Sequence, residues 1–242
     1  MVIKRRIDSL LVERGLGESQ AKAQALIMAG EVVVEGKVVT KSGTLVAEGA
    51  AITILEPPPF VSRGGLKLGY ALDRFQLDVS AKVVADIGAS TGGFTDCLLK
   101  RGAGRVYAID VGYGQLDYRL RQDSRVVVME RVNARYPINL PEKVDLATLD
   151  VSFISVEKVI PSVAQLLKDS GYLLVLIKPQ FEARRREVGK GGVIKQPIVH
   201  ARVLGRFIAW TVKHSFRLGG LVASPILGVS GNKEFFALLK LS

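Results

Sequence analysis

Residues 83–94 read VVADIGASTGGF, and this stretch decides the fold class. It begins with five largely apolar residues, as in a strand that is buried on both faces of a parallel sheet. Glycines at positions 88, 92 and 93 follow directly, and a helical pattern starts beside the last two. A strand, a glycine-rich turn and a helix in this order form the first unit of a doubly wound α/β fold.

The chain after residue 60 continues this alternation. Strand patterns are expected at residues 105–110, 125–130, 145–150 and 172–179, with further strands around 221–227 and 234–242. Helix patterns are expected at 61–75, 92–102, 115–122, 155–169 and 197–216, and Pro161 should shorten or kink the fourth. The alternation predicts a Rossmann-like domain with a doubly wound, mostly parallel sheet, whose ligands bind at the carboxyl ends of the strands.

The first 60 residues follow a different pattern. Amphipathic helices are expected at 7–15 and 19–30, a hairpin with a Glu-Gly turn at 32–40, and a strand at 51–55. Three consecutive prolines in EPPPF, residues 56–60, make a stiff linker. The chain therefore divides into a small α+β module at 1–56, a proline-rich linker at 57–62 and an α/β domain at 63–242. A module of this size suits binding better than chemistry.

The charge of the chain indicates an anionic partner, of which nucleic acid is the commonest. The 242 residues carry a formal net charge of +11. Residues 1–60 hold seven basic and seven acidic side chains, so the excess lies in the rest of the chain. The densest basic run is ARRREVGKGGVIK, residues 183–195. Its glycines favour a mobile arm that closes over a polyanion, and a solvated loop is the alternative.

Composition disfavours several protein classes. No apolar run reaches the ~18 residues of a membrane span, and the first residues lack the pattern of a secretory signal. A single cysteine, Cys97, fits a reducing compartment, and one cysteine with two histidines offers little material for a zinc site. We expect a cytoplasmic protein with no metal and no membrane partner.

The glycine-rich turn predicts a nucleotide site, and two acids indicate which nucleotide. No Gly-Lys-[Ser/Thr] follows, so the turn is not a P-loop, and its G-x-x-x-G-G spacing is a poor dinucleotide fingerprint. Asp86 precedes the turn, where a carboxylate repels a pyrophosphate but pairs with the ammonium of S-adenosylmethionine. Asp110 ends the next strand, where an acid can bind both ribose hydroxyls; two capping aspartates are the alternative. The turn residues expected to bind this cofactor are Gly88, Ala89, Ser90, Thr91, Gly92, Gly93 and Phe94.

A buried strand pattern, LLVLIKPQFE at residues 173–182, ends in Lys178. Burying an unpaired ammonium is costly, so this position needs a reason. Asp150 ends the preceding strand pattern, and Lys67 lies on the helix after the linker. If all three face the crevice, the second ammonium favours the uncharged form of Lys178, which can then act as a general base. Taken singly, Lys178 and Asp150 can each be explained equally well as a charged residue at a strand end that reaches solvent.

The N-terminal module resembles the S4 RNA-binding domain. The resemblance lies in RIDSLLVERGL, residues 6–16, and in the spacing S-x-x-x-A-x-x-x-I-x-x-G-x-V-x-V-x-G, residues 19–36. Gln20 and Lys22 stand where arginines are frequent, which weakens the implied RNA binding without removing it. The implied RNA contacts lie on one side of the module and are Lys4, Arg5, Arg6, Lys22 and Lys41.

Seven motifs occur in order behind this module, namely SRGGLKL, DIGASTGGF, AIDVGYGQL, LDVSFIS, LIKPQFE, VGKGGVI and GNKEFF. In this order the chain resembles the TlyA family of rRNA 2′-O-methyltransferases, which have an FtsJ-like catalytic domain and are often named haemolysins. The resemblance implies a tetrad in which Lys178 accepts the proton of a ribose 2′-hydroxyl, while the other three members orient it and tune its charge. The tetrad carries over onto Lys67, Asp150, Lys178 and Glu234.

The resemblance also implies S-adenosylmethionine as cofactor, with Asn133 near its adenine, and ribosomal RNA or a ribosomal subunit as partner. The expected target is a cytidine ribose, in large-subunit rRNA because the chain lacks the longer C-terminal tail of some members. Lys195 and Gln196 depart from the family, where Arg and Asp are frequent. The RNA contacts expected from this domain are Arg63, Arg184, Arg185, Arg186, Lys190 and Lys195.

Three other functions compete with this interpretation. A non-enzymatic RNA-binding or ribosome-binding protein would share the charge and the S4-like module, but it would not need the four tetrad residues together. A cytolysin is suggested by the older name of the family, and the lack of a signal peptide and of amphipathic membrane segments argues against it. Asp86 disfavours an NAD-dependent oxidoreductase. The sequence leaves the oligomeric state open.

Overall fold

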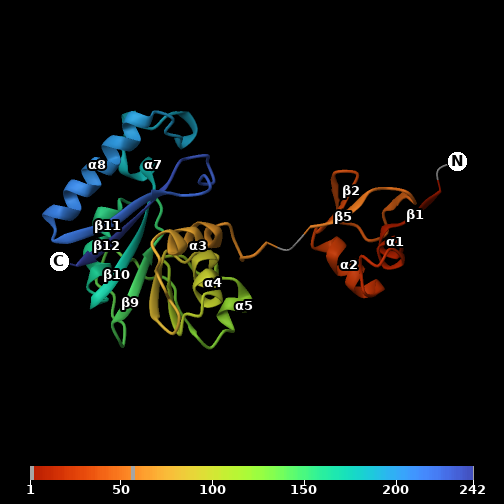
Figure 1. The fold of residues 1–242 in the computed structure, drawn as a ribbon, viewed down its shortest axis with the longest axis horizontal. Coiled ribbons are helices and arrows are strands. Elements are labelled where there is room, and N and C mark those ends of the chain that lie inside the picture. Colours follow the sequence, from red (N-terminus) through yellow and green to blue (C-terminus); the bar gives the residue numbers. More distant parts are fainter. Residues whose placement is uncertain (1–2, 56–57, 242) are drawn as a thin grey trace. The chain divides into compact units, whose positions relative to one another are not determined.

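The structure, a computed structural model, describes residues 3–55 and 58–241. Contacts within the chain divide it into two compact units, Met1–Pro58 and Pro59–Ser242. Figure 1 shows the elements of each unit coloured along the chain and labels many of them. Part of the expected linker, Pro57, lies outside the described residues, as do the ends of the expected domains at 1–2, 56 and 242.

The N-terminal unit combines two helices with two small antiparallel sheets, as the α+β prediction requires. Strand β2 pairs with β3 and β5, and β1 pairs with β4. Helix α2 begins after Ser19, whose side-chain oxygen accepts a hydrogen bond from the backbone N–H of Lys22 at 3.2 Å. Strands β1 and β4 were not predicted, because three residues are too few for a visible alternation. The elements are β1 (Lys4–Arg6), α1 (Ile7–Glu13), α2 (Gln20–Met28), β2 (Val32–Val34), β3 (Lys37–Val39), β4 (Leu45–Ala47) and β5 (Ile52–Ile54).

The second unit is built on a seven-stranded sheet in the order β11-β12-β10-β9-β6-β7-β8. Strand β12 runs antiparallel to its neighbours β10 and β11, and the other pairs are parallel. The prediction of a doubly wound, mostly parallel sheet is confirmed. The strand order reverses between β6 and β9, which is where a crevice opens in such sheets. The strands are β6 (Val83–Ile87), β7 (Arg105–Ile109), β8 (Val126–Met129), β9 (Val144–Leu149), β10 (Leu167–Ile177), β11 (Phe216–Ala223) and β12 (Phe235–Leu241).

The helix expected at 155–169 is shorter than its pattern. A 3₁₀ turn, η1 (Val156–Lys158), is followed by α6 (Ile160–Ala164), and Pro161 lies in the first turn of α6, where its missing N–H costs nothing. Residues from Leu167 onward join β10 instead, because Leu167 pairs with Val144 of β9. The remaining elements are α3 (Gly64–Arg74), α4 (Gly93–Lys100), α5 (Tyr118–Arg121), α7 (Pro179–Glu182), η2 (Arg185–Glu187), η3 (Lys190–Gly192) and α8 (Pro197–Lys213).

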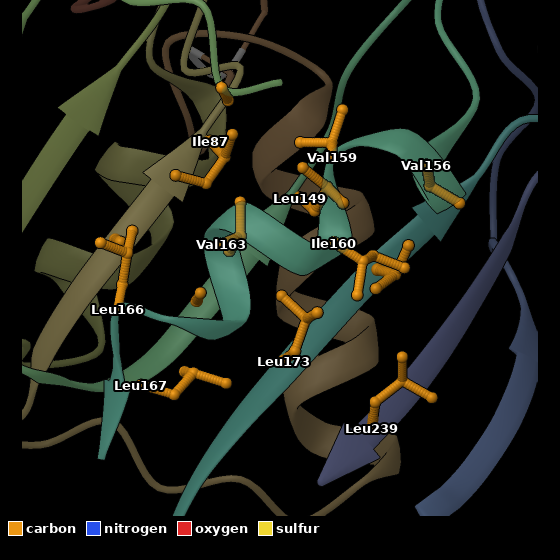
Figure 2. Close-up of a cluster of buried hydrophobic side chains, with 14 of the residues drawn as sticks. Ile87, Leu149, Val156, Val159, Ile160, Val163, Leu166, Leu167, Leu173 and Leu239 are labelled. Atoms are coloured by element: carbon orange, nitrogen blue, oxygen red, sulfur yellow. The ribbon is translucent and has the colours of Figure 1, made fainter. Parts of the chain in front are cut away.

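The core of this unit lies on both faces of the sheet. Successive residues of β10 alternate between the faces, so that Leu173 and Val175 join one cluster and Leu174 and Leu176 the other. The first cluster packs against η1, α6 and α8, and part of it, including Leu173, is drawn in Figure 2. The second packs against α3, α4 and α5. The central strands are therefore buried on both faces, and their carboxyl ends are held rigidly for the site.

Candidate active site

Two cavities lie at the carboxyl ends of the central strands. The first, of about 470 Å³, is bounded by the segments that follow β6, β7, β8 and β9. The second, of about 670 Å³, is bounded by α3, by the segments after β6, β9 and β10, and by the loop before β12. The cavities are adjacent because they share wall residues, which are Gly88, Ser90, Asp150, Ser152 and Phe153.

Lys178 and Asp150 form an ion pair on the wall of the second cavity. Lys178 follows the last residue of β10 and precedes Pro179, the first residue of α7. Its Nζ lies 2.6 Å from Asp150 Oδ1 and donates a hydrogen bond to Ser152 Oγ at 2.9 Å. The two side chains are 12% and 21% exposed, so the ammonium faces the cavity without being open to bulk water. The parallel pairing of β9 and β10 brings the two strand ends together.

Lys67 and Glu234 form a second ion pair on the same cavity. The Nζ of Lys67 on α3 donates a hydrogen bond to Glu234 Oε2 at 2.6 Å, and both side chains are buried. A buried charge of this kind requires a partner, and Glu234 provides it. We expected the Lys67 ammonium to act on Lys178, whereas Glu234 offsets its charge in the structure. The four tetrad residues come together as two ion pairs on one cavity.

The glycine-rich turn brings the ends of β6 and β9 into close contact. Gly88 has φ of 84°, and a Cβ at this position would overlap the carbonyl oxygen of Asp150. Gly92 has φ of 96°, and a Cβ there would overlap the side chains of Leu120 on α5 and of Leu116 just before that helix. Both positions therefore require glycine. Most of the predicted turn residues line one or both cavities, with Gly92 as the exception; those that do are Gly88, Ala89, Ser90, Thr91, Gly93 and Phe94.

Asp110 lies on the wall of the first cavity. Its Oδ2 accepts a hydrogen bond from the backbone N–H of Ser90 at 2.8 Å, and its Oδ1 accepts one from Gly112 at 2.6 Å. These two bonds fix the carboxylate and leave lone pairs for further donors. Asn133 is exposed on the same wall, and its Oδ1 accepts a hydrogen bond from the N–H of Arg135 at 3.1 Å. The other walls include apolar side chains, among them Ile87, Ile109, Val132 and Val159.

Asp86 does not reach either cavity, which corrects the expectation that it binds a ligand ammonium. It is fully buried, and its two oxygens accept hydrogen bonds from Thr95 Oγ1 at 2.7 Å and Thr148 Oγ1 at 2.9 Å. Burial raises the pKa of Asp86 to about 6, against the lowering effect of the two hydroxyls. The Asp86 carboxylate connects α4, β6 and β9 beneath the site. The carboxylate that faces the first cavity between β6 and β7 is that of Asp110.

Comparison with known proteins identifies the family. The FtsJ-like methyltransferase family matches residues 60–241, and the S4 domain family matches residues 5–52. The Bacillus subtilis protein YqxC, named as a candidate rRNA methyltransferase, is 48% identical over 96% of this chain and 84% of its own length. The 16S/23S rRNA (cytidine-2′-O)-methyltransferase TlyA of Mycobacterium tuberculosis is 42% identical over 99% of this chain and 91% of its own. This chain belongs to the TlyA family of FtsJ-like methyltransferases.

A solved structure agrees with this assignment. A candidate hemolysin from Streptococcus thermophilus has a TM-score of 0.76 and 42% identity, covering 100% of this chain and 90% of that one. In the described part of this TlyA-family chain, no helix combines the length and apolar character needed to span a bilayer. Over the same residues, no group of three or more His, Cys, Asp or Glu side chains could hold a metal ion.

The basic residues expected to bind RNA in the N-terminal unit fall into two groups. Arg5 forms ion pairs with Glu13 and Glu48, and Arg6 forms one with the buried Asp8 at 2.6 Å. The Arg6 guanidinium holds the pKa of Asp8 well below its usual range. The charges of these two arginines are therefore paired with acidic side chains of the same unit. The lysines expected to bind RNA are all exposed, and within the described residues their side chains make no hydrogen bond or ion pair; these are Lys4, Lys22 and Lys41.

The basic arm, which we define as residues 184–195, exposes its charges and is anchored at both ends. Glu187 accepts a hydrogen bond from the backbone N–H of Arg184 at 2.9 Å and forms an ion pair with Arg202 on α8. At the other end Ile194 is buried. Arg63 is also exposed and lines the second cavity. The exposed basic residues of the arm are Arg184, Arg185, Arg186, Lys190 and Lys195.

Phe153 is a residue of the TlyA-family site that sequence reasoning missed. It is 91% exposed, lines both cavities, and has φ of 64°, which is rare for a bulky residue. Its ring lies 5.0 Å from that of Phe181, measured between centroids. The motif LDVSFIS could have indicated it. Phe153 comes three residues after Asp150, in the loop that follows a strand, where an aromatic side chain does not usually pack into the core.

Proposed function

We propose that this chain is an S-adenosylmethionine-dependent methyltransferase that acts on the 2′-hydroxyl of a ribose in ribosomal RNA. The observation that carries the proposal is the Lys178–Asp150 ion pair, in which Asp150 lines both cavities and Lys178 lines the second. A methyl donor and an RNA ribose need adjacent sites, and the two cavities supply them. The Mycobacterium tuberculosis relative is named as a cytidine-2′-O-methyltransferase, which supports a cytidine ribose. We propose large-subunit rRNA as the first substrate and the cytoplasm as the place of action.

The first cavity has the properties that the adenosine part of S-adenosylmethionine requires. Its volume lies within the range of small-molecule sites, roughly 300–1,000 Å³. Its apolar walls suit a purine ring, and Asp110 provides a fixed carboxylate for two ribose hydroxyls. Asn133 is the polar group for the purine edge. When bound, S-adenosylmethionine supplies an electrophilic methyl group.

The second cavity contains the groups that prepare the nucleophile. The Lys178 amine accepts the proton of the ribose hydroxyl, and Asp150 stabilises the positive charge that Lys178 then carries. Ser152 fixes the direction of the Lys178 side chain. The Lys67 ammonium, held by Glu234, is a hydrogen-bond donor for the ribose oxygen as it becomes anionic. Holding the oxygen in line with the methyl group supplies most of the rate, since orientation can be worth ~7–11 kcal/mol.

Exposed cations provide the binding surface for RNA. In the N-terminal unit we assign this role to Lys4, Lys22 and Lys41 rather than to the ion-paired Arg5 and Arg6. In the catalytic unit we assign it to Arg63 and the basic arm. Phe153 offers an exposed ring on which the target base can stack.

The test combines cofactor binding with mapping of methyl groups. Calorimetry should detect S-adenosylmethionine binding, and Asp110→Ala should weaken it by roughly 1.5–3 kcal/mol, the range for hydrogen bonds to a charged group. Labelled methyl transfer to large-subunit rRNA, with small-subunit rRNA in parallel, should place the label on the 2′-oxygen of a cytidine. Binding of rRNA without cofactor binding or transfer would support the non-enzymatic alternative and refute the proposal.

A further inference from the structure

The side chain of Asn232 is 1% exposed, although it lies in the loop between β11 and β12. Its Oδ1 accepts a hydrogen bond from the backbone N–H of Ile194 at 2.9 Å. Its Nδ2 donates a hydrogen bond to the carbonyl oxygen of Gly192 at 2.8 Å. Both partners belong to the basic arm, so one side chain anchors the glycine-rich end of that arm.

The same residue belongs to the turn that encloses Glu234. The carbonyl oxygen of Asn232 accepts a hydrogen bond from the N–H of Gly228 at 2.9 Å. Gly228 lies directly against the carboxylate of Glu234, because a Cβ on Gly228 would overlap Glu234 Oε1. Glu234 is the partner of Lys67. Asn232 therefore lies between the arm and one ion pair of the tetrad.

We propose that Asn232 is a positioning residue that couples RNA binding by the basic arm to the geometry of the Lys67–Glu234 pair. The proposal rests on the proposed function, because it concerns how the same active site receives its RNA. Phosphates that bind the exposed arginines hold the arm in place, and Asn232 transmits that restraint to the turn around Glu234. Without this anchor the arm is less ordered, and each phosphate contact has to be made at a larger entropic cost.

Asparagine suits this position because its amide offers one acceptor and two donors. Alanine would make neither hydrogen bond and would leave the N–H of Ile194 unsatisfied in a buried place. Aspartate keeps the volume and the acceptor, but it loses the donor and brings a charge against the carbonyl oxygen of Gly192. Asn232→Ala therefore removes the whole anchor, and Asn232→Asp removes its donor half.

The first experiment compares these variants with Asn139→Ala, a matched substitution at an exposed asparagine. Asn232→Ala and Asn232→Asp should raise the KM for large-subunit rRNA by about tenfold and lower kcat as well. For both variants, the salt dependence of rRNA binding should fall to the value of the triple variant Arg184→Ala/Arg185→Ala/Arg186→Ala, which lacks the arginines of the arm. Binding of S-adenosylmethionine, measured by calorimetry, should be unchanged, because Asn232 lines neither cavity. Asn139→Ala should behave as wild type.

A double-mutant cycle separates coupling from simple structural support. In the background that lacks the three arm arginines, Asn232→Ala should raise the rRNA KM much less than it does in wild type. A residue that only supports the fold would have the same effect in both backgrounds. Equal effects, or a wild-type KM and salt dependence in Asn232→Ala, would overturn the proposal.

Hydrogen exchange of the wild-type chain tests the anchor even if the variants fold poorly. The amide of Ile194 should exchange slowly, while the neighbouring amides of Gly191 and Lys195 exchange fast; fast exchange at Ile194 would contradict the anchor. These results are distinguishable from a failure of the proposed function. If wild type transfers no methyl group, the exchange and the salt dependence of rRNA binding still report on Asn232. If wild type is active and the variants match it, only the coupling is wrong.

Discussion

Lys178 directly follows a strand whose last five residues are fully buried. Such a strand has no structural need for a terminal cation, and the cost of partial burial is offset by the Asp150 carboxylate at 2.6 Å. The residue pattern alone predicted that Lys178 and Asp150 face one crevice. It could not predict the pairing of Lys67 with Glu234, which are 167 positions apart in the chain.

Asp86 is the residue for which the structure changes the prediction most. In the sequence, Asp86 comes just before the glycine-rich turn, which suggested a role in ligand binding. Only the packing of α4 and β9 shows that its two oxygens already accept hydrogen bonds from Thr95 and Thr148. Because its folded pKa of about 6 lies above the ordinary 3.8, the folded protein keeps this proton in a window where the unfolded chain releases it. The stabilisation is therefore complete below pH 3.8 and is lost as pH rises through about 6.

We expect Asp86→Asn to remove this pH dependence. From about pH 3 to about pH 7, which spans both pKa values, wild type should lose about 3 kcal/mol of unfolding free energy relative to the variant, which follows from a pKa shift of roughly two units. Urea unfolding followed by the fluorescence of Trp210, the single tryptophan of the chain, measures this difference. Parallel stability curves for the two proteins would show that Asp86 does not titrate in this window.

Phe153 is expected to act through its ring. Phe153→Ala should weaken binding of rRNA by about 1–3 kcal/mol, the range for one stacked base. Phe153→Tyr, which keeps a ring, is the matched control and should bind as wild type does. Alanine is as strained as phenylalanine at φ of 64°, so the comparison isolates the ring from the backbone. Equal loss in both variants would point to the backbone instead.

At the scale of elements, strands with continuous apolar runs were predicted well, and short or interrupted elements were not. Residues 173–177 were recognised because five apolar residues in a row fit a strand buried on both faces. The start of β10 at Leu167 was missed, since LKDSG carries no such pattern and is held only by pairing with β9. In α6, Pro161 lies at the start of the helix, and the residues from Leu167 onward belong to β10 instead.

The basic arm makes the element-scale prediction. Arg184→Ala/Arg185→Ala/Arg186→Ala should reduce the salt slope of rRNA binding by about 0.7–0.9 for each phosphate that the arm no longer neutralises. The control, Lys82→Ala/Lys213→Ala/Lys240→Ala, removes the same charge from residues that neither belong to the arm nor line the two cavities. Its slope should stay close to that of wild type. If the two triple variants show the same reduction in slope, the arm contributes only net charge.

At the scale of the whole molecule, the excess of positive charge belongs to the catalytic unit, since residues 1–60 are balanced. The fold class and the family could be predicted from sequence, because ordered motifs at the ends of strands specify a sheet and its crevice together. The partners of individual charges could not be predicted, because the arrangement of strands in the sheet decides them. Arg5 and Arg6 illustrate this: both were expected to contact RNA, and both form ion pairs within the chain.

The central claim is that Lys178 takes the proton of a ribose hydroxyl in rRNA. Its most direct test is single-turnover methyl transfer to large-subunit rRNA by wild type, Lys178→Ala and Lys178→Arg, with S-adenosylmethionine binding measured for each. Both variants should bind the cofactor and fail to transfer, because alanine has no base and a guanidinium stays protonated. Transfer by Lys178→Arg at the wild-type rate would contradict the claim, since Lys178 would then act as a positive charge only.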